Sequence, residues 1–129
     1  MAILAFRAGE AIQAGDAVYV DSSPFVYKGL GDTQEKSSVI GIAEDRGNIG
    51  DLIRINTDNI CYKLTGFDVN EYLFLSFIQP GLVVDYATWE SDLSSAAFNP
   101  YLTRVGRALS STAVEVEINK PVSFVNPFV

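Results

Sequence analysis

The sequence predicts an all-β protein, a small β-sandwich or β-barrel-like single domain with short strands. Its 129 residues include eight Phe, six Tyr and one Trp, and aromatic side chains suit half-buried pleated surfaces. Short apolar runs recur along the chain with Gly, Asp and Asn between them, as in sandwiches and barrels. No amphipathic pattern is long enough for the crossover helices that a parallel α/β sheet needs.

Strands and turns are expected to alternate along the whole chain. At most one short helix is expected, within the polar loop 87–100, and 29–38 is expected to be an exposed loop. The clearest half-buried strand is 114–118, in which Val and Ile alternate with Glu. The expected strands are 17–21, 25–28, 39–43, 51–56, 60–64, 72–78, 82–85 and 114–118, and the run 103–109 repeats the glycine motif.

The two chain ends are expected to be extended arms. Residues 1–7 form the predicted N-terminal arm, 8–119 the β-domain and 120–129 the C-terminal arm. The first arm suits an edge strand or a contact with a neighbouring subunit. The second packs on its own domain or docks on a partner, because a frayed apolar end would expose a sticky patch. The candidate partner-binding residues are Ile3, Leu4, Phe6, Trp89, Phe124, Val125 and Phe128.

Three segments share one pattern, a small Gly-containing run, a polar turn and an alternating strand. They are AGEAIQAGDAVYV (8–20), GIAEDRGNIGDLIRIN (41–56) and GRALSSTAVEVEI (106–118). Glycine in such a run allows a bulge or a close approach of two backbones. The three segments can share this pattern because turns followed by strands generally favour such residues. Alternatively, they form similar structural units around one core. The spacing is too irregular for a solenoid.

Composition excludes several classes of partner and site. The net charge of −7 argues against nucleic acid, since binding phosphates needs a basic face. Cys61 is the only cysteine, so an intramolecular disulfide is excluded and a buried inert thiol is expected. The N-terminus has no basic segment and only a short apolar run. We therefore expect neither a signal peptide nor a membrane span, and folding in a cytoplasm.

The sequence lacks the usual catalytic side chains. There is no histidine, which excludes triads with a His base and His-ligated metals. One cysteine excludes thiolate-rich zinc sites, and no phosphate-binding loop or dinucleotide fingerprint is present. We expect no enzymatic activity, no cofactor and no metal.

Carboxylates near aromatic residues remain as candidate chemistry. Asp85, Glu90 and Asp92 flank Tyr86 and Trp89, and a glycosidase needs two carboxylates across a sugar. The favoured interpretation is a solvated acidic loop with Trp89 as a core or interface anchor.

For two other clusters of charged residues, a structural role is favoured over ligand binding. Glu44, Asp45 and Asp51 offer oxygen ligands for calcium, but their spacing matches no EF-hand, so a role in turns is favoured. Arg104 and Arg107 lie three residues apart, and surface salt bridges are favoured over anion binding.

On the three segments quoted above, the chain resembles the capsid decoration, or cement, proteins of tailed bacteriophages. Many of these begin with an "aGdaV" turn and strand, continue with "GiA…a.GD.v.v" and close with "iGrAL". The resemblance covers residues 8–118. The loop 86–100 and the apolar tail depart from the family pattern.

The resemblance implies a non-enzymatic virion protein that binds the outer capsid surface and bridges subunits of the major capsid protein. Self-association is implied too, with a homotrimer favoured and a homodimer possible, and without nucleic acid or membrane. Such a protein is made in the bacterial host cytoplasm. Alternatives are a head fibre base, a tail protein, or a carbohydrate-binding β-domain using Trp89, Tyr86 and Asp85.

Overall fold

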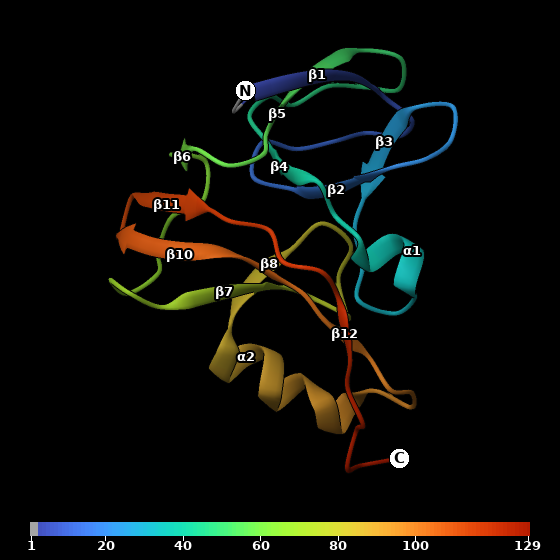
Figure 1. Cartoon of the computed structure of the whole chain (residues 1–129), viewed down its shortest axis with the longest axis vertical. Coiled ribbons are helices and arrows are strands. Elements are labelled where there is room, and N and C mark those ends of the chain that lie inside the picture. The colour runs from blue at the N-terminus through green and yellow to red at the C-terminus, as the bar shows by residue number, and fades with distance from the viewer. Residues whose placement is uncertain (1–2) are drawn as a thin grey trace.

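The computed structural model describes residues 3–129 and confirms the all-β prediction (Figure 1). Strands form two main sheets stacked along the long axis of the molecule, and short helices flank them. The elements are β1 (Ile3–Ala8), β2 (Ala17–Val20), β3 (Phe25–Lys28), α1 (Gln34–Ser37), β4 (Gly41–Ala43), β5 (Leu52–Asn56), β6 (Ile60–Cys61), β7 (Tyr72–Leu75), β8 (Val83–Asp85), α2 (Tyr86–Ser91), the 3₁₀ helix η1 (Asp92–Ser95), β9 (Tyr101–Leu102), β10 (Arg104–Ser110), β11 (Ala113–Val116) and β12 (Val122–Ser123).

The first sheet is a closed barrel with the strand order β1-β3-β2-β4-β5. Strand β1 runs antiparallel to β5, from Ile3 opposite Asn56 to Arg7 opposite Leu52, and parallel to β3. The segment predicted as an N-terminal arm is therefore part of a barrel strand over residues 3–7, because each of these residues pairs with β5, and β3 pairs with Arg7 and Ala8. Residues 1–2 of that predicted arm lie outside the described residues. Closure leaves the barrel without a free edge.

The second sheet is antiparallel and open, with the order β6-β11-β10-β7-β8. One core cluster joins it to the barrel, because Ala17 and Ile42 of the barrel pack with Leu73, Leu75 and Val105 of the sheet. The apolar run predicted as a strand over 72–78 leaves the sheet after Leu75. The Ser76 hydroxyl there accepts hydrogen bonds from the two backbone amides at 78 and 79 (3.0 and 3.1 Å), which closes a turn.

Helix α2 and η1 lie against the second sheet on the side away from the barrel (Figure 1). Together they are the short helix expected within 87–100, and they run from Tyr86 to Ser95. The Asp85 side chain accepts a hydrogen bond from the Thr88 amide (2.8 Å) and caps α2. A single helical turn, α1, lies within the predicted loop 29–38, where the Thr33 side chain caps it.

The repeated glycine has the same role in both sheets. A Cβ at Gly41 would lie 2.3 Å from the backbone oxygen of Asn56 on the neighbouring strand, and a Cβ at Gly106 would lie 2.3 Å from that of Glu115. No real side chain tolerates such a contact, so each position requires glycine for close strand approach. The prediction of close backbone approach in the segments 41–56 and 106–118 is confirmed.

Candidate functional site

The predicted partner-binding residues do not form one surface. Ile3, Leu4 and Phe6 belong to β1 of the barrel, whereas the others come from α2 and the C-terminal segment. Strand β1 and the C-terminal segment lie at opposite ends of the long axis (Figure 1). Phe6 packs partly on the barrel core and Leu4 is 41% exposed.

Trp89 cannot contact a partner in this structure, because it is fully buried. Its ring packs edge-on against Phe77 (5.2 Å between centroids) and Phe124 (5.0 Å) and stacks with Tyr86 (6.1 Å). Its placement in the partner-binding set is therefore corrected, and so is its part in the carbohydrate-binding alternative. Of the two roles considered for Trp89, the structure assigns the core anchor. Asp85 leaves the carbohydrate alternative as well, because its carboxylate caps α2.

The C-terminal segment is fixed to its own domain as far as Asn126. Strand β12 pairs with β9, and Phe124 packs on Trp89. The buried Asn126 amide donates hydrogen bonds to the carbonyls of Leu93 (3.0 Å), Ala96 (3.3 Å) and Phe98 (3.1 Å). Leu93 lies in η1, and Ala96 and Phe98 follow it, so these carbonyls lie at the end of the helical segment. Carbonyls at a helix end lack partners within the helix, and the Asn126 amide provides hydrogen bonds to all three.

The same segment also presents an apolar, uncharged outer surface. We call residues 121–129 the C-terminal edge, and they include no charged side chain. Val125 is 81% exposed and Phe128 63% exposed. Because the Phe124 amide bonds the Pro100 carbonyl, the backbone groups of Ser123 and Val125 point away from β9. The C-terminal edge therefore combines exposed apolar side chains with a free strand edge.

Carboxylates of the 41–56 segment make turns and ion pairs. Asp45 accepts two hydrogen bonds from the Arg54 guanidinium (2.7 and 2.9 Å), which lower the pKa of that carboxyl. Glu44 accepts from the buried Asn56 amide, and Asp51 from the Asn48 backbone. Over residues 3–129 no group of three or more His, Cys, Asp and Glu is placed to hold a metal. These contacts account for the three carboxylates that were considered as calcium ligands.

The predicted salt bridges of Arg104 and Arg107 are confirmed. Both lie on β10 and pair with Glu117 and Glu115, the latter at 3.6 Å. These glutamates belong to the neighbouring chain segment, so the outer face of the second sheet carries two cross-strand ion pairs.

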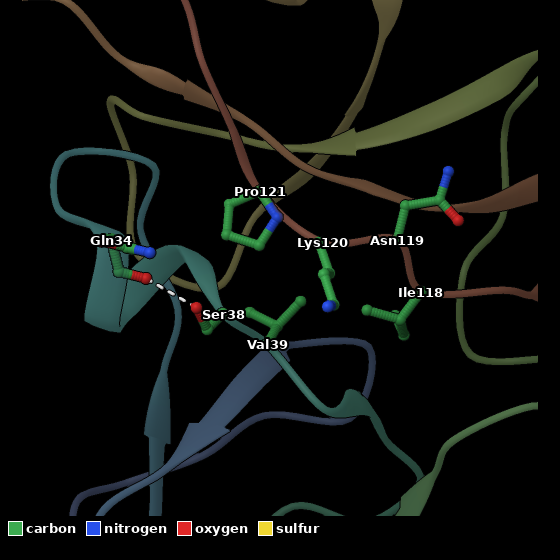
Figure 2. A pocket seen from close by; sticks show the side chains of 7 residues that line it. All are labelled: Gln34, Ser38, Val39, Ile118, Asn119, Lys120 and Pro121. Atoms are coloured by element: carbon green, nitrogen blue, oxygen red, sulfur yellow. Dashed lines mark hydrogen bonds between the residues drawn. The ribbon is translucent and has the colours of Figure 1, made fainter.

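A pocket of about 380 Å³ lies between α1 and the chain that leads from β11 to β12. Figure 2 shows Lys120 between Val39 and Ile118, with Pro121 and Ser38 on the rim. No carboxylate lines it, so it offers no acid–base pair for general catalysis.

A second hollow, of about 480 Å³, lies on the outer face of the second sheet beside α2. We call it the aromatic groove. The residues lining it are Asn70, Glu71, Tyr72, Phe74, Tyr86 and Ala87. The sequence predicts a strand over 72–78, but the groove on its outward face was not predicted. The alternation of Tyr72 and Phe74 with the buried Leu73 and Leu75 indicates which side chains point outward.

No protein-family model matches this chain, and no curated protein matches it. No helix within residues 3–129 has the length and apolar character needed to span a membrane.

Proposed function

We propose that this protein is a non-enzymatic virion component that binds the outer surface of a phage capsid and bridges subunits of the major capsid protein. The observation that carries the proposal is the C-terminal edge. The contacts of Phe124 and Asn126 fix it in place, while Val125 and Phe128 face outward. The motif resemblance over residues 8–118 supplies the identity of the partner.

The C-terminal edge suits a contact with a large protein surface. Its backbone is already ordered by β9 and by Asn126, so binding loses little conformational entropy. Its free N–H and C=O groups suit pairing with an extended segment of a partner, with side-chain pockets adding specificity. The C-terminal edge has no charged side chain, although the chain has a net charge of −7. The charges elsewhere on the surface favour solubility, and the edge itself does not repel an acidic partner.

Bridging stabilises a lattice through linkage. A ligand that binds only the mature, expanded lattice favours that state by mass action. Self-association multiplies the contacts and adds avidity, and we propose a homotrimer, with a homodimer as the alternative. The same apolar edge would serve a head fibre base or a tail protein, which is the competing location in the virion.

Co-sedimentation tests the proposal. The purified protein is mixed with expanded capsids, with unexpanded shells and with purified tails of a phage whose genome encodes it. We expect saturable binding to expanded capsids, weaker binding to unexpanded shells and none to tails. Binding to tails alone would move the protein to the tail, and binding to neither would refute the proposal. Light scattering on the free protein distinguishes trimer from dimer.

A further inference from the structure

The helical segment covers only part of the outer face of the second sheet. Phe77 and Val84 are buried beneath α2 and η1. Tyr72 lies on the same strand as Phe74 but further from the helical cover, and it is 49% exposed. Between this uncovered end of β7 and the first turn of α2 lies the aromatic groove.

Two tyrosine rings line this groove, and each is held by contacts with neighbouring side chains. The Tyr86 ring stacks on the buried Trp89 with an interplanar angle of 16°, and the edge contact with Phe74 (5.6 Å between centroids) fixes it further. The Arg104 guanidinium lies over the Tyr72 ring, 4.7 Å from its centroid. Because Tyr86 is 42% exposed and Tyr72 49% exposed, both rings are held in place and remain open to a ligand.

Polar side chains on the loop before β7 complete the groove. The Asn70 side-chain oxygen accepts a hydrogen bond from Arg107 (3.1 Å), which orients the amide and leaves its nitrogen as a donor. One oxygen of Glu71 accepts from the Asp68 amide (2.8 Å), which orients its carboxylate. A carboxylate has capacity for several further hydrogen bonds. The groove therefore has aromatic walls with an oriented amide and an oriented carboxylate beside them.

We propose that the aromatic groove binds a neutral carbohydrate. A sugar ring has an apolar C–H face, which packs on an aromatic ring, and hydroxyl groups, which bond to amides and carboxylates at its edge. The volume of about 480 Å³ lies within the usual range for small-ligand sites. Glu71 and the net charge of −7 disfavour an acidic sugar. None of the residues that line the groove belongs to the C-terminal edge, so this inference does not rest on the proposed capsid contact.

The site does not reproduce the geometry of a glycosidase. The pKa of Asp85 is lowered, first by its side-chain hydrogen bond with Thr88, and its carboxylate is occupied as the cap of α2. Glu71 is then the single carboxylate lining the groove, whereas hydrolysis needs an opposed pair. We therefore propose binding without cleavage.

Trp89 provides a probe for this groove. It is the only tryptophan in the chain, and its ring stacks on Tyr86. The full-length protein would first be screened on a glycan array and then titrated with the neutral oligomers maltohexaose, cellohexaose and hexa-N-acetylchitohexaose. A hexamer of polyguluronate serves as the acidic comparison. Trp89 fluorescence and two-dimensional NMR of the tyrosine rings give the binding curves.

We expect a saturable change with at least one neutral glycan, and shifts centred on Tyr72 and Tyr86. The Tyr72→Ala variant should weaken binding about tenfold or more, while Tyr72→Phe keeps most of it. Tyr62→Ala is the matched control, because Tyr62 is 65% exposed and does not line the groove. If no neutral glycan binds at millimolar concentration, or if folded Tyr72→Ala binds as well as the parent, the proposal is overturned. Loss of capsid binding in Tyr72→Ala without any glycan binding would reassign the groove to a protein contact.

Discussion

The two ends of the chain have similar apolar residues, yet the fold uses them differently. Residues 3–8 form β1, which closes a barrel by pairing with β5 from Ile3 to Arg7 and with β3 at Arg7 and Ala8. The C-terminal residues form β12, which pairs only with β9 and leaves its other edge free. An apolar end is thus part of the fold where its strand closes a barrel, and it is available to a partner where its strand is the edge of a two-stranded sheet.

Within the C-terminal segment, different residues are expected to determine the stability of the fold and the binding of a partner. In the C-terminal segment, Phe124 and Asn126 point inward while Val125 and Phe128 point outward. Inward residues should affect the free energy of unfolding, and outward residues should affect association.

The largest effect is expected from deleting residues 1–7. The deletion removes most of β1 and opens the barrel, so most of the roughly 5–15 kcal/mol that stabilises a typical domain should be lost. Circular dichroism during urea denaturation should show no cooperative transition. A deletion of 121–129 should keep a transition while shifting Trp89 emission to the red, because Phe124 no longer covers the indole. A deletion of 1–7 that unfolds at the parent midpoint would show that β1 is a dispensable arm.

Asn126→Ala should destabilise the fold by about 2–3 kcal/mol. The change leaves the carbonyls of Ala96 and Phe98 without the amide that bonds them, while the Leu93 carbonyl keeps the Ala96 amide. Unsatisfied acceptors that are buried cost roughly that much. Urea denaturation followed by Trp89 fluorescence measures it. Val125→Ala is the control and should stay within about 0.5 kcal/mol, because the side chain is 81% exposed. Equal effects of the two variants would contradict the division between inward and outward residues.

Gly41→Ala and Gly106→Ala compare the two sheets directly. Each new Cβ would lie 2.3 Å from a backbone oxygen of the adjacent strand, and such overpacking costs about 1–3 kcal/mol. The closed barrel restricts the movement of β4 away from β5, whereas β11 in the open sheet has only the short β6 beyond it. We therefore expect Gly41→Ala to cost more than Gly106→Ala in thermal unfolding. The reverse order would show that barrel closure does not limit relaxation.

The smallest effect concerns Cys61, in the core that joins the two sheets. Burial raises the pKa of the Cys61 thiol from 9.0 to about 11. The unfolded thiol therefore loses its proton first, and the contribution of Cys61 to stability falls as pH rises from about 9 to about 11, by about 2 kcal/mol at most. The difference in unfolding free energy between the parent and Cys61→Ala isolates this term. A difference that stays constant over that pH range would contradict a buried neutral thiol.

Local patterns were sufficient to predict most of the strands and several of their contacts, but not β9 and β12. Alternation in 114–118 and the apolar run at Tyr72 placed strands in the second sheet, and the glycines at 41 and 106 indicated close backbone approach. These features depend on neighbours along the chain. Barrel closure depends on the pairing of β1 with β3 and β5, which no local pattern encodes.

The sites were harder to predict, because exposure depends on which elements cover which face. Trp89 was included among the partner-binding residues because its loop is polar in sequence, yet Phe124 and Phe77 bury it from distant segments. Asn126 carries no sequence signal for three simultaneous hydrogen bonds, since its acceptors lie 28 to 33 residues away. The aromatic groove required the outward face of β7 and the start of α2 to be seen together.

Binding isotherms of edge variants on expanded capsids test the central claim most directly. Phe128→Asp and Val125→Asp place a charge on the exposed C-terminal edge, and Tyr62→Asp places one on a side chain of similar exposure elsewhere (65% against 63% for Phe128). We expect all three proteins to unfold like the parent, and both edge variants to bind capsids about tenfold or more weakly while Tyr62→Asp binds normally. Parent-like binding by both edge variants would contradict a role of the C-terminal edge in capsid binding.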